Sequence, residues 1–187
     1  MALVLASVSL QANLTIPADF RTVVNDASLI VRGRITDVRA IEVPGSGIES
    51  VATVVVENVL KGHASGFVYV RVPGGVIGNK RFVMVGAPAF HVGQRAVLFL
   101  RPGTTDGAFR PIGLTMGVYQ IQTDPATHRV LVEPPVLAGK TTGATGPVVR
   151  GDRRRPPVTV SEFESLVKLA MATPPGSTVV NRGGGGR

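Results

Sequence analysis

The chain of 187 residues contains no cysteine and no tryptophan. The absence of cysteine excludes disulfide bonds, thiolate metal sites and thiol nucleophiles. It leaves the cellular compartment open, because many exported proteins also lack cysteine. Aromatic residues make up only 5% of the chain, so a core has to come mainly from Val, Ile, Leu and Phe. An unbroken apolar run long enough for a membrane-spanning helix is also absent from the sequence.

Positive charge is in excess and is unevenly distributed. The formal net charge is +8, and most of the excess lies after residue 139. A basic tail of this kind can bind nucleic acid, acidic polymers or anionic lipid. The positive charge can also serve solubility, or reflect a composition rich in arginine, and neither explanation requires a ligand. We favour this simpler interpretation.

The first twelve residues, MALVLASVSLQA, are apolar and rich in small side chains. They are typical of the apolar and cleavage regions of a secretory signal peptide whose basic beginning is missing. We therefore predict a truncated signal peptide over 1–12 and an exported protein, periplasmic or extracellular. The alternative is that Met1–Ala12 forms a first strand on the core, in which case the protein is cytoplasmic.

Short apolar segments alternate with turn residues through most of the chain. The 23 glycines and 14 prolines are more than an average composition supplies and fit many short strands joined by turns. About eight strands are predicted. Hairpin-type connections favour an antiparallel barrel or sandwich over alternating strands and helices. Examples of the predicted strands are 67–73, 81–86, 95–101 and a pair formed by 108–114 with 117–123.

One strand is predicted over 28–40, where apolar residues alternate with Arg32, Arg34 and Thr36 on a solvent-exposed face. Gly33 interrupts this alternation. A glycine inside a strand indicates a bulge or a sharp bend.

A helix is predicted at each end of the strand region. Pro17 is typical of the first position of a helix, and the apolar spacing that follows predicts a short helix over 17–27. Near the C-terminus, Ser161 and Glu164 match a capping box at the start of a second helix over 159–172. The apolar face of this second helix consists of Phe163, Leu166, Val167 and Ala170.

Composition sets the domain boundaries. The β-barrel domain is predicted to cover 17–133. The segment 134–158 is rich in Gly, Pro, Thr and Arg, which is typical of a flexible basic linker or a long loop. The last residues, 173–187, end in RGGGGR and are predicted to be disordered, because they offer little apolar area to bury.

The stretch VPGGVIGNKRF, residues 72–82, invites comparison with a phosphate-binding loop. A P-loop needs four residues between its glycines, then Lys and a hydroxyl residue, where a helix begins. Only three residues separate Gly74 from Gly78. Arg81 follows Lys80, at the position where a P-loop has its hydroxyl residue. The sequence therefore predicts a β-hairpin. Its turn positions are Gly74, Gly75 and Gly78.

Groups that carry chemistry are scattered. The three histidines, His63, His91 and His128, each fall in a separate predicted turn, and a nucleophile elbow is absent. The candidate carboxylates are explained as turn and strand-end residues, and they are Asp106, Asp124 and Glu133. We predict no catalytic residue, no metal and no cofactor, and hence a protein that is not an enzyme.

The densest cluster of charge is the run Arg153, Arg154 and Arg155, which could contact phosphate groups. Lys80 and Arg81 are a second, smaller group of candidate binding residues. Aromatic residues do not interleave with the arginine run, so it offers no stacking platform. An alternative platform on the strands is possible, but strand aromatics are more often core residues, and we favour that interpretation. The aromatics concerned are Phe67, Tyr69 and Phe82.

Five blocks, ASLIVRGRITDVRA, ENVLKG, VRVPGGVIG, GAPAFHVGQRAVLFL and IGLTMGVYQI, together resemble an uncharacterised exported bacterial β-domain. That domain occurs alone or ahead of other modules, including matrixin-like metalloprotease regions. The resemblance covers about residues 19–133 and implies a fold similar to the OB-like barrels of netrin-like modules. Netrin-like protease inhibitors use an N-terminal cysteine, which this chain lacks, so inhibition by that route is not expected. Gly93 is interpreted as part of a corner before the apolar strand.

The sequence therefore predicts a mainly β fold, an antiparallel OB-like (netrin-like) barrel with a short N-terminal helix and a C-terminal helix. We expect a non-catalytic, exported accessory or binding module. Its expected partner is an unknown protein or an acidic polymer at the cell envelope. The alternative is an OB-type nucleic-acid-binding protein that uses the barrel face and the arginine-rich linker, which exposed aromatics beside arginines would favour. A third option is a fragment of a secreted hydrolase.

Overall fold

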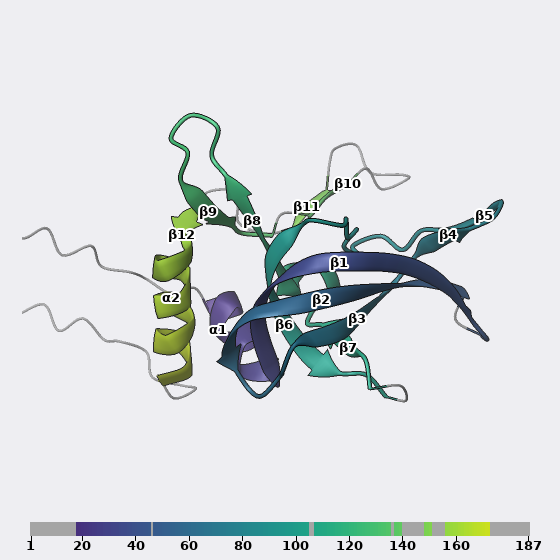
Figure 1. The fold of residues 1–187 in the computed structure, drawn as a ribbon, viewed down its shortest axis with the longest axis horizontal. Coiled ribbons are helices and arrows are strands. Elements are labelled where there is room, and N and C mark those ends of the chain that lie inside the picture. Colours follow the sequence, from purple (N-terminus) through teal and green to yellow (C-terminus); the bar gives the residue numbers. More distant parts are fainter. Residues whose placement is uncertain are drawn as a thin grey trace, which may run out of the picture.

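The structure is a computed structural model of the 187-residue chain. It describes residues 18–45, 47–104, 107–135, 137–139, 148–150 and 156–172, and every structural statement below concerns these ranges. The predicted signal peptide and the C-terminal tail lie outside them. Within them the fold is mainly β with a helix at each end of the strand region, which confirms that part of the prediction (Figure 1).

Helix α1 (Ala18–Asp26) is the first described element. Phe20 and Val24 are buried, because they lie on the face of the helix that packs against the sheet. Lys61 closes the C-terminal end of α1, where its Nζ donates hydrogen bonds of 2.8 and 3.0 Å to the carbonyl oxygens of Val24 and Asn25. A cation at this end of a helix also interacts favourably with the helix dipole.

Strands β1 (Leu29–Val43) and β2 (Gly47–Lys61) form a long antiparallel pair. Their register shifts next to Gly33, which is the bulge that the sequence indicated. A Cβ atom at Gly33 would lie 2.6 Å from both the Val54 side chain and the Val55 carbonyl oxygen, so this approach requires glycine. On its other edge, the first part of β1 pairs with a second strand, β6.

Three strands connect the two edges of this pair: β3 (Phe67–Pro73), β6 (Arg95–Pro102) and β7 (Phe109–Pro111). The pairings run β1-β2-β3-β7-β6 and return from β6 to β1. All are antiparallel except β3 with β7, which meet in parallel at Val70 and Phe109. The sheet is therefore mixed, which corrects the prediction of a purely antiparallel arrangement. The reason is geometric, because a circuit of five strands cannot alternate in direction throughout.

The main sheet continues through β8 (Val118–Thr123), β9 (Val130–Glu133) and β12 (Val158–Thr159). The predicted pairing of 108–114 with 117–123 is wrong. β1 occupies one edge of β6, so β7 and β8 follow one another along its other edge. The short 3-10 helix η1 (Leu114–Gly117) separates β7 from β8.

Two short hairpins complete the fold. β4 (Gly75–Ile77) and β5 (Lys80–Phe82) pair antiparallel, so the strand predicted over 81–86 ends at its second residue. β10 (Leu137–Gly139) and β11 (Val148–Arg150) form the other pair. The segment predicted as a flexible linker therefore contains strands, because its apolar residues find backbone partners in one another and, through β12, in β9.

Two apolar clusters lie on the two sides of β6. One is enclosed by the circuit of strands, and Ala96, Leu98 and Leu100 point into it. The other lies between the sheet and the two helices, and Val97 and Phe99 point into it. Because β6 is covered on both faces, it is apolar without alternation, as its sequence RAVLFLR shows.

Helix α2 (Val160–Ala172) packs against the second cluster, with Phe163, Val167 and Ala170 buried as predicted. Its capping box is displaced from the predicted one by two residues. The Thr159 hydroxyl accepts a hydrogen bond of 3.3 Å from the N–H of Glu162, whose carboxylate accepts one of 2.8 Å from the N–H of Thr159. The cap lies at Thr159 because β12 pairs up to that residue and the helix begins directly after it.

Candidate functional site

The outer face of β1, β2 and β3 carries the most distinctive group of side chains. Residues directly opposite one another in neighbouring strands point to the same side of a sheet. One row across the three strands is therefore Arg34, Val55 and Phe67. The next rows are Asp37, Thr53 and Tyr69, and then Arg39, Val51 and Arg71. We call Arg34, Arg39, Val55, Phe67 and Tyr69 the aromatic face.

Phe67 and Tyr69 are surface residues, so the interpretation that they belong to the core is wrong. Their exposed fractions are 53% and 41%, and their rings meet edge to face with centroids 5.3 Å apart. The alternation of β3 places Val68, Val70 and Val72 inside and these aromatics outside. Because nothing described covers this side of β3, the aromatics stay in contact with solvent. Phe82 lies apart from them, with its ring against Gly47 at the other end of β2.

The electrostatics of this side of the sheet are set by one buried carboxylate. Glu49 accepts hydrogen bonds from Arg71 Nε at 2.8 Å and from Arg110 Nη2 at 3.1 Å. Two arginines therefore surround a single acid, which leaves a net positive charge there. Arg34 and Arg39 are exposed and form no ion pair with any described residue. The aromatic face thus combines apolar rings with two arginines that form no ion pair with a described residue, and the exposed Asp37 lies in the row between them.

The candidate residues named from the sequence lie elsewhere. Arg153, Arg154 and Arg155 fall outside the described residues. Lys80 forms an exposed ion pair of 3.3 Å with Glu42 on β1. Arg81 is exposed and lies directly opposite Val76 in the hairpin.

The four turn glycines, Gly74, Gly75, Gly78 and Gly93, all have positive φ. The closest approach is at Gly75, where a Cβ atom would lie 2.9 Å from Ile48 Cγ2. The β4–β5 hairpin therefore packs directly on the β1–β2 pair. Because a strand follows the loop, its backbone does not present the helix N-terminus that a phosphate-binding loop uses.

A second polar cluster fixes α2 to the sheet. Glu57 on β2 accepts a hydrogen bond of 2.6 Å from Arg95 Nη2 and lies 3.7 Å from Arg32 Nε. The hydrogen bond to Glu57 raises the pKa of Arg95 above its usual value, although partial burial opposes this. Glu164 on α2 accepts hydrogen bonds from Arg32 at 2.8 Å and from Asn58 at 3.0 Å. The pairing of these charges across four elements indicates a structural role.

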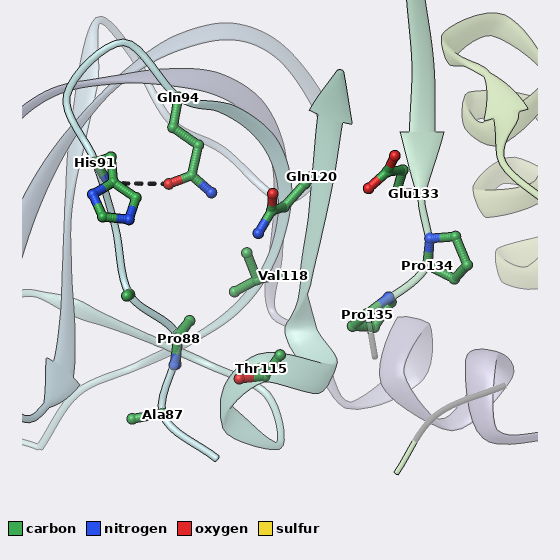
Figure 2. A pocket seen from close by; sticks show the side chains of 11 residues that line it. Ala87, Pro88, His91, Gln94, Thr115, Val118, Gln120, Glu133, Pro134 and Pro135 are labelled. Carbon is green, nitrogen blue, oxygen red and sulfur yellow. Dashed lines mark hydrogen bonds between the residues drawn. The ribbon is translucent and has the colours of Figure 1, made fainter. Parts of the chain in front are cut away.

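An open hollow of about 600 Å³ lies between the loop before β6 and the start of β8 (Figure 2). Proline and alanine side chains form much of its wall, and polar groups enter from His91, Gln94, Gln120 and Glu133. The Gln94 side-chain oxygen accepts a 3.0 Å hydrogen bond from the N–H of His91, so its amide nitrogen is directed away from that bond. Among the described residues that line the hollow, no nucleophile is hydrogen-bonded to a general base.

Other classes of site are scarce in the described part of the chain. Across these ranges, no group of three His, Asp or Glu side chains is arranged to hold a metal ion. None of the helices within the same ranges is long and apolar enough to cross a membrane. Comparison of the chain with known protein families and with curated proteins gives no match.

The sequence contained a partial signal for the aromatic face. The alternation around Arg34 indicated one exposed face of that strand, and FVYVRVP alternates aromatic and valine residues. The helices α1 and α2 pack against another part of the sheet, and this placement decides which side of β3 is exposed. It cannot be predicted from a local sequence pattern.

Proposed function

We propose that this chain is a non-catalytic binding module built on an OB-like barrel of the netrin-like kind. The circuit β1-β2-β3-β7-β6 supports the barrel, since an OB-fold is a five-stranded Greek-key barrel. The side chains of one apolar cluster lie within this circuit, as they would inside a small barrel.

The binding surface of the module is the aromatic face. The observation that carries this proposal is the exposure of Phe67 and Tyr69 side by side on β3, in a chain with few aromatic residues. Exposed apolar groups bordered by polar ones commonly mark interaction sites. Arg34 and Arg39 give the face a positive charge, which suits an acidic polymer or an acidic protein surface.

The proposal includes export to the cell envelope or beyond, on the basis of the apolar segment 1–12. Intact mass measurement of the protein isolated from its natural cells tests this part. A mature chain that starts after Ala12 supports export, and a chain that retains these residues in the cytoplasm contradicts it.

Single-stranded nucleic acid is a second candidate ligand, and a specific observation favours it. Single-strand binders combine a basic groove with aromatic side chains on which bases stack, and OB-folds bind oligonucleotides on this side of the barrel. Phe67 lies in the same row as Arg34, so a stacked base and its phosphate could be contacted together.

The two ligands are distinguished by titration of labelled oligo-dT and labelled polyuronate across a salt series. Polyuronate carries negative charge and sugar rings but no bases, so a preference for one probe over the other at equal salt distinguishes the two ligands. The variants are Phe67→Ala with Tyr69→Ala, and Arg34→Ala with Arg39→Ala. Arg129→Ala, an exposed arginine in the β8–β9 turn, is the matched control. The triple change Arg153→Ala, Arg154→Ala and Arg155→Ala tests the linker separately.

For nucleic acid, oligo-dT should bind more tightly than polyuronate, and loss of the two aromatics should weaken oligo-dT binding at least tenfold. For an acidic polymer, polyuronate should bind more tightly than oligo-dT, and both pairs of substitutions should weaken its binding. If neither probe binds near physiological salt, or neither pair of substitutions matters, the aromatic face does not bind a polyanion and both candidates fail.

A further inference from the structure

A second exposed apolar surface lies at the other end of the β1–β2 pair from the aromatic face. Val76 on β4 has an exposed fraction of 58%, and three consecutive residues after β5 are also exposed. These are Val83, Met84 and Val85, at 65%, 41% and 76%. Together with Lys80 and Arg81 of β5 we call them the hairpin strip. Single exposed apolar residues are common on protein surfaces, whereas four large ones this close in sequence indicate an interaction surface.

The hairpin strip is held in place at both of its ends. Upstream, the β4–β5 ladder pairs Gly75 with Phe82, and Gly74 donates a 2.8 Å hydrogen bond to the carbonyl oxygen of Ile48. Downstream, the Gly86 carbonyl oxygen accepts hydrogen bonds from the N–H and the hydroxyl of Thr115, at 3.1 and 2.8 Å. The exposed valines therefore belong to a segment that hydrogen bonds hold in place at both ends.

The two sides of the hairpin differ in chemistry. On β5, Lys80 and Phe82 face the β1–β2 pair, where Lys80 meets Glu42 and the Phe82 ring meets Gly47. Arg81 alternates to the other side, directly opposite Val76, and has no ion pair with a described residue. The outward side thus presents Arg81 beside Val76, and the exposed residues Val83, Met84 and Val85 follow directly after β5.

The position of the hairpin suits a flat partner. Figure 1 shows β4 and β5 projecting at one end of the molecule, while α2 and the β8–β9 hairpin lie at the opposite end. A hairpin that projects at this end can reach a planar surface without obstruction by the two helices or the β8–β9 hairpin.

We propose that the hairpin strip binds the surface of an anionic lipid bilayer. The valines and Met84 enter the boundary between headgroups and acyl chains, and Arg81 contacts the lipid phosphates. Peripheral binding of this kind combines buried apolar area with attraction between basic residues and anionic headgroups. The cation and the exposed aliphatic side chains together fit this partner, whereas a nucleic acid would leave the aliphatic side chains without a stacking partner.

The test is co-sedimentation of the full chain with vesicles of phosphatidylcholine alone and of phosphatidylcholine mixed equally with phosphatidylglycerol. The apolar variant is Val83→Asp with Val85→Asp, and the charge variant is Arg81→Glu. The matched control is Val130→Asp, on an exposed position of β9 far from the hairpin. Circular dichroism of each variant confirms that it is folded.

A second measurement uses the absence of tryptophan from the chain. A Val85→Trp variant carries a single indole whose emission reports its surroundings, and Val130→Trp is its control. We expect a blue shift and quenching by brominated lipid for Val85→Trp on mixed vesicles, and neither for Val130→Trp.

We expect binding to the mixed vesicles and little to phosphatidylcholine alone, with a reduction of roughly tenfold in the apolar and charge variants and none in the control. Absence of binding to mixed vesicles, or binding that both variants retain, overturns the proposal. Self-association that Val83→Asp with Val85→Asp abolishes, without any vesicle binding, also overturns it and assigns the strip to contact between two copies of the chain.

Discussion

The carboxylate of Glu164 on α2 accepts a 2.8 Å hydrogen bond from Nη1 of Arg32 on β1, across 132 positions of sequence. The same oxygen accepts a second hydrogen bond from the side chain of Asn58 on β2. Glu164 is thus the point at which the C-terminal helix is fixed to the two longest strands. The apolar face of α2 provides burial, while this contact sets the position of the helix along the sheet.

Glu164→Ala should destabilise the protein by about 1–3 kcal/mol, because Arg32 Nη1 and the Asn58 amide lose their hydrogen bonds at a partly buried site and Arg32 keeps only its longer contact with Glu57. Urea unfolding monitored by circular dichroism measures the change. Lys168→Ala, an exposed position on the same helix, should have little effect. Equal midpoints for the two variants would show that apolar packing alone holds α2.

Thr159→Ala should destabilise the protein more at neutral pH than at acid pH. Hydrogen bonds from the Thr159 hydroxyl and N–H lower the pKa of Glu162 below its ordinary value. A carboxyl whose pKa is lower in the folded state stabilises the fold above its unfolded pKa, about 4.3 for Glu, and loses this contribution as the pH falls through the folded pKa. The difference in urea midpoint between wild type and variant should therefore shrink below about pH 4.

An NMR titration of the side-chain carboxyls provides the matching local measurement. In Thr159→Ala the pKa of Glu162 should rise towards its ordinary value. Asp124 is the internal control, because its pKa is lowered by hydrogen bonds from Thr127 and Ala126 instead and should not change. A shift of both residues would indicate a global change in the fold.

Gly33→Ala should destabilise the protein by about 1–3 kcal/mol, because the added Cβ would lie 2.6 Å from Val54 and from the Val55 carbonyl oxygen. Thermal unfolding measures this. Gly66→Ala is a useful comparison, since its Cβ would meet nothing within 4 Å and only its positive φ is costly. If Gly33→Ala is the milder change, the bulge in β1 does not depend on close contact.

Phe67→Ala should change the free energy of unfolding by less than about 1 kcal/mol, whereas Phe99→Ala should cost about 3–5 kcal/mol. The reason is burial, since Phe99 is fully buried among Phe20, Tyr119 and Phe163 while Phe67 is half exposed. Urea unfolding of both variants provides the comparison. A large loss for Phe67→Ala would indicate that the aromatic face supports the fold, and the binding proposal would lose its basis.

Local pattern was informative wherever a segment has one exposed and one buried side. The strand at 67–73, the helix near 159–172 and the bulge at Gly33 were all predicted from spacing and from single residue types. The glycines after Val72 predicted a hairpin, and one forms around Gly78, but its strands are 75–77 and 80–82, and 67–73 pairs elsewhere. These features depend on interactions between residues close in sequence, so the sequence records them directly.

Pairing between distant segments was not available from the same patterns. The sequence did not reveal that β7 and β8 share an edge of β6, or that β12 joins β9, because both depend on which strand edges remain free. The capping box was predicted at Ser161, whereas it lies at Thr159, because β12 pairs up to that residue and the helix begins directly after it.

By itself, the sequence determined the mainly β class, the two helices and the absence of any cysteine chemistry. Only the tertiary structure decided that Phe67 and Tyr69 are exposed and that Arg34 lies in the same row as Phe67, with Val55 between them. A strand that alternates apolar and aromatic residues has two sides able to be buried. Because α1 and α2 cover the sheet at β6, the outer side of β3 stays exposed to solvent.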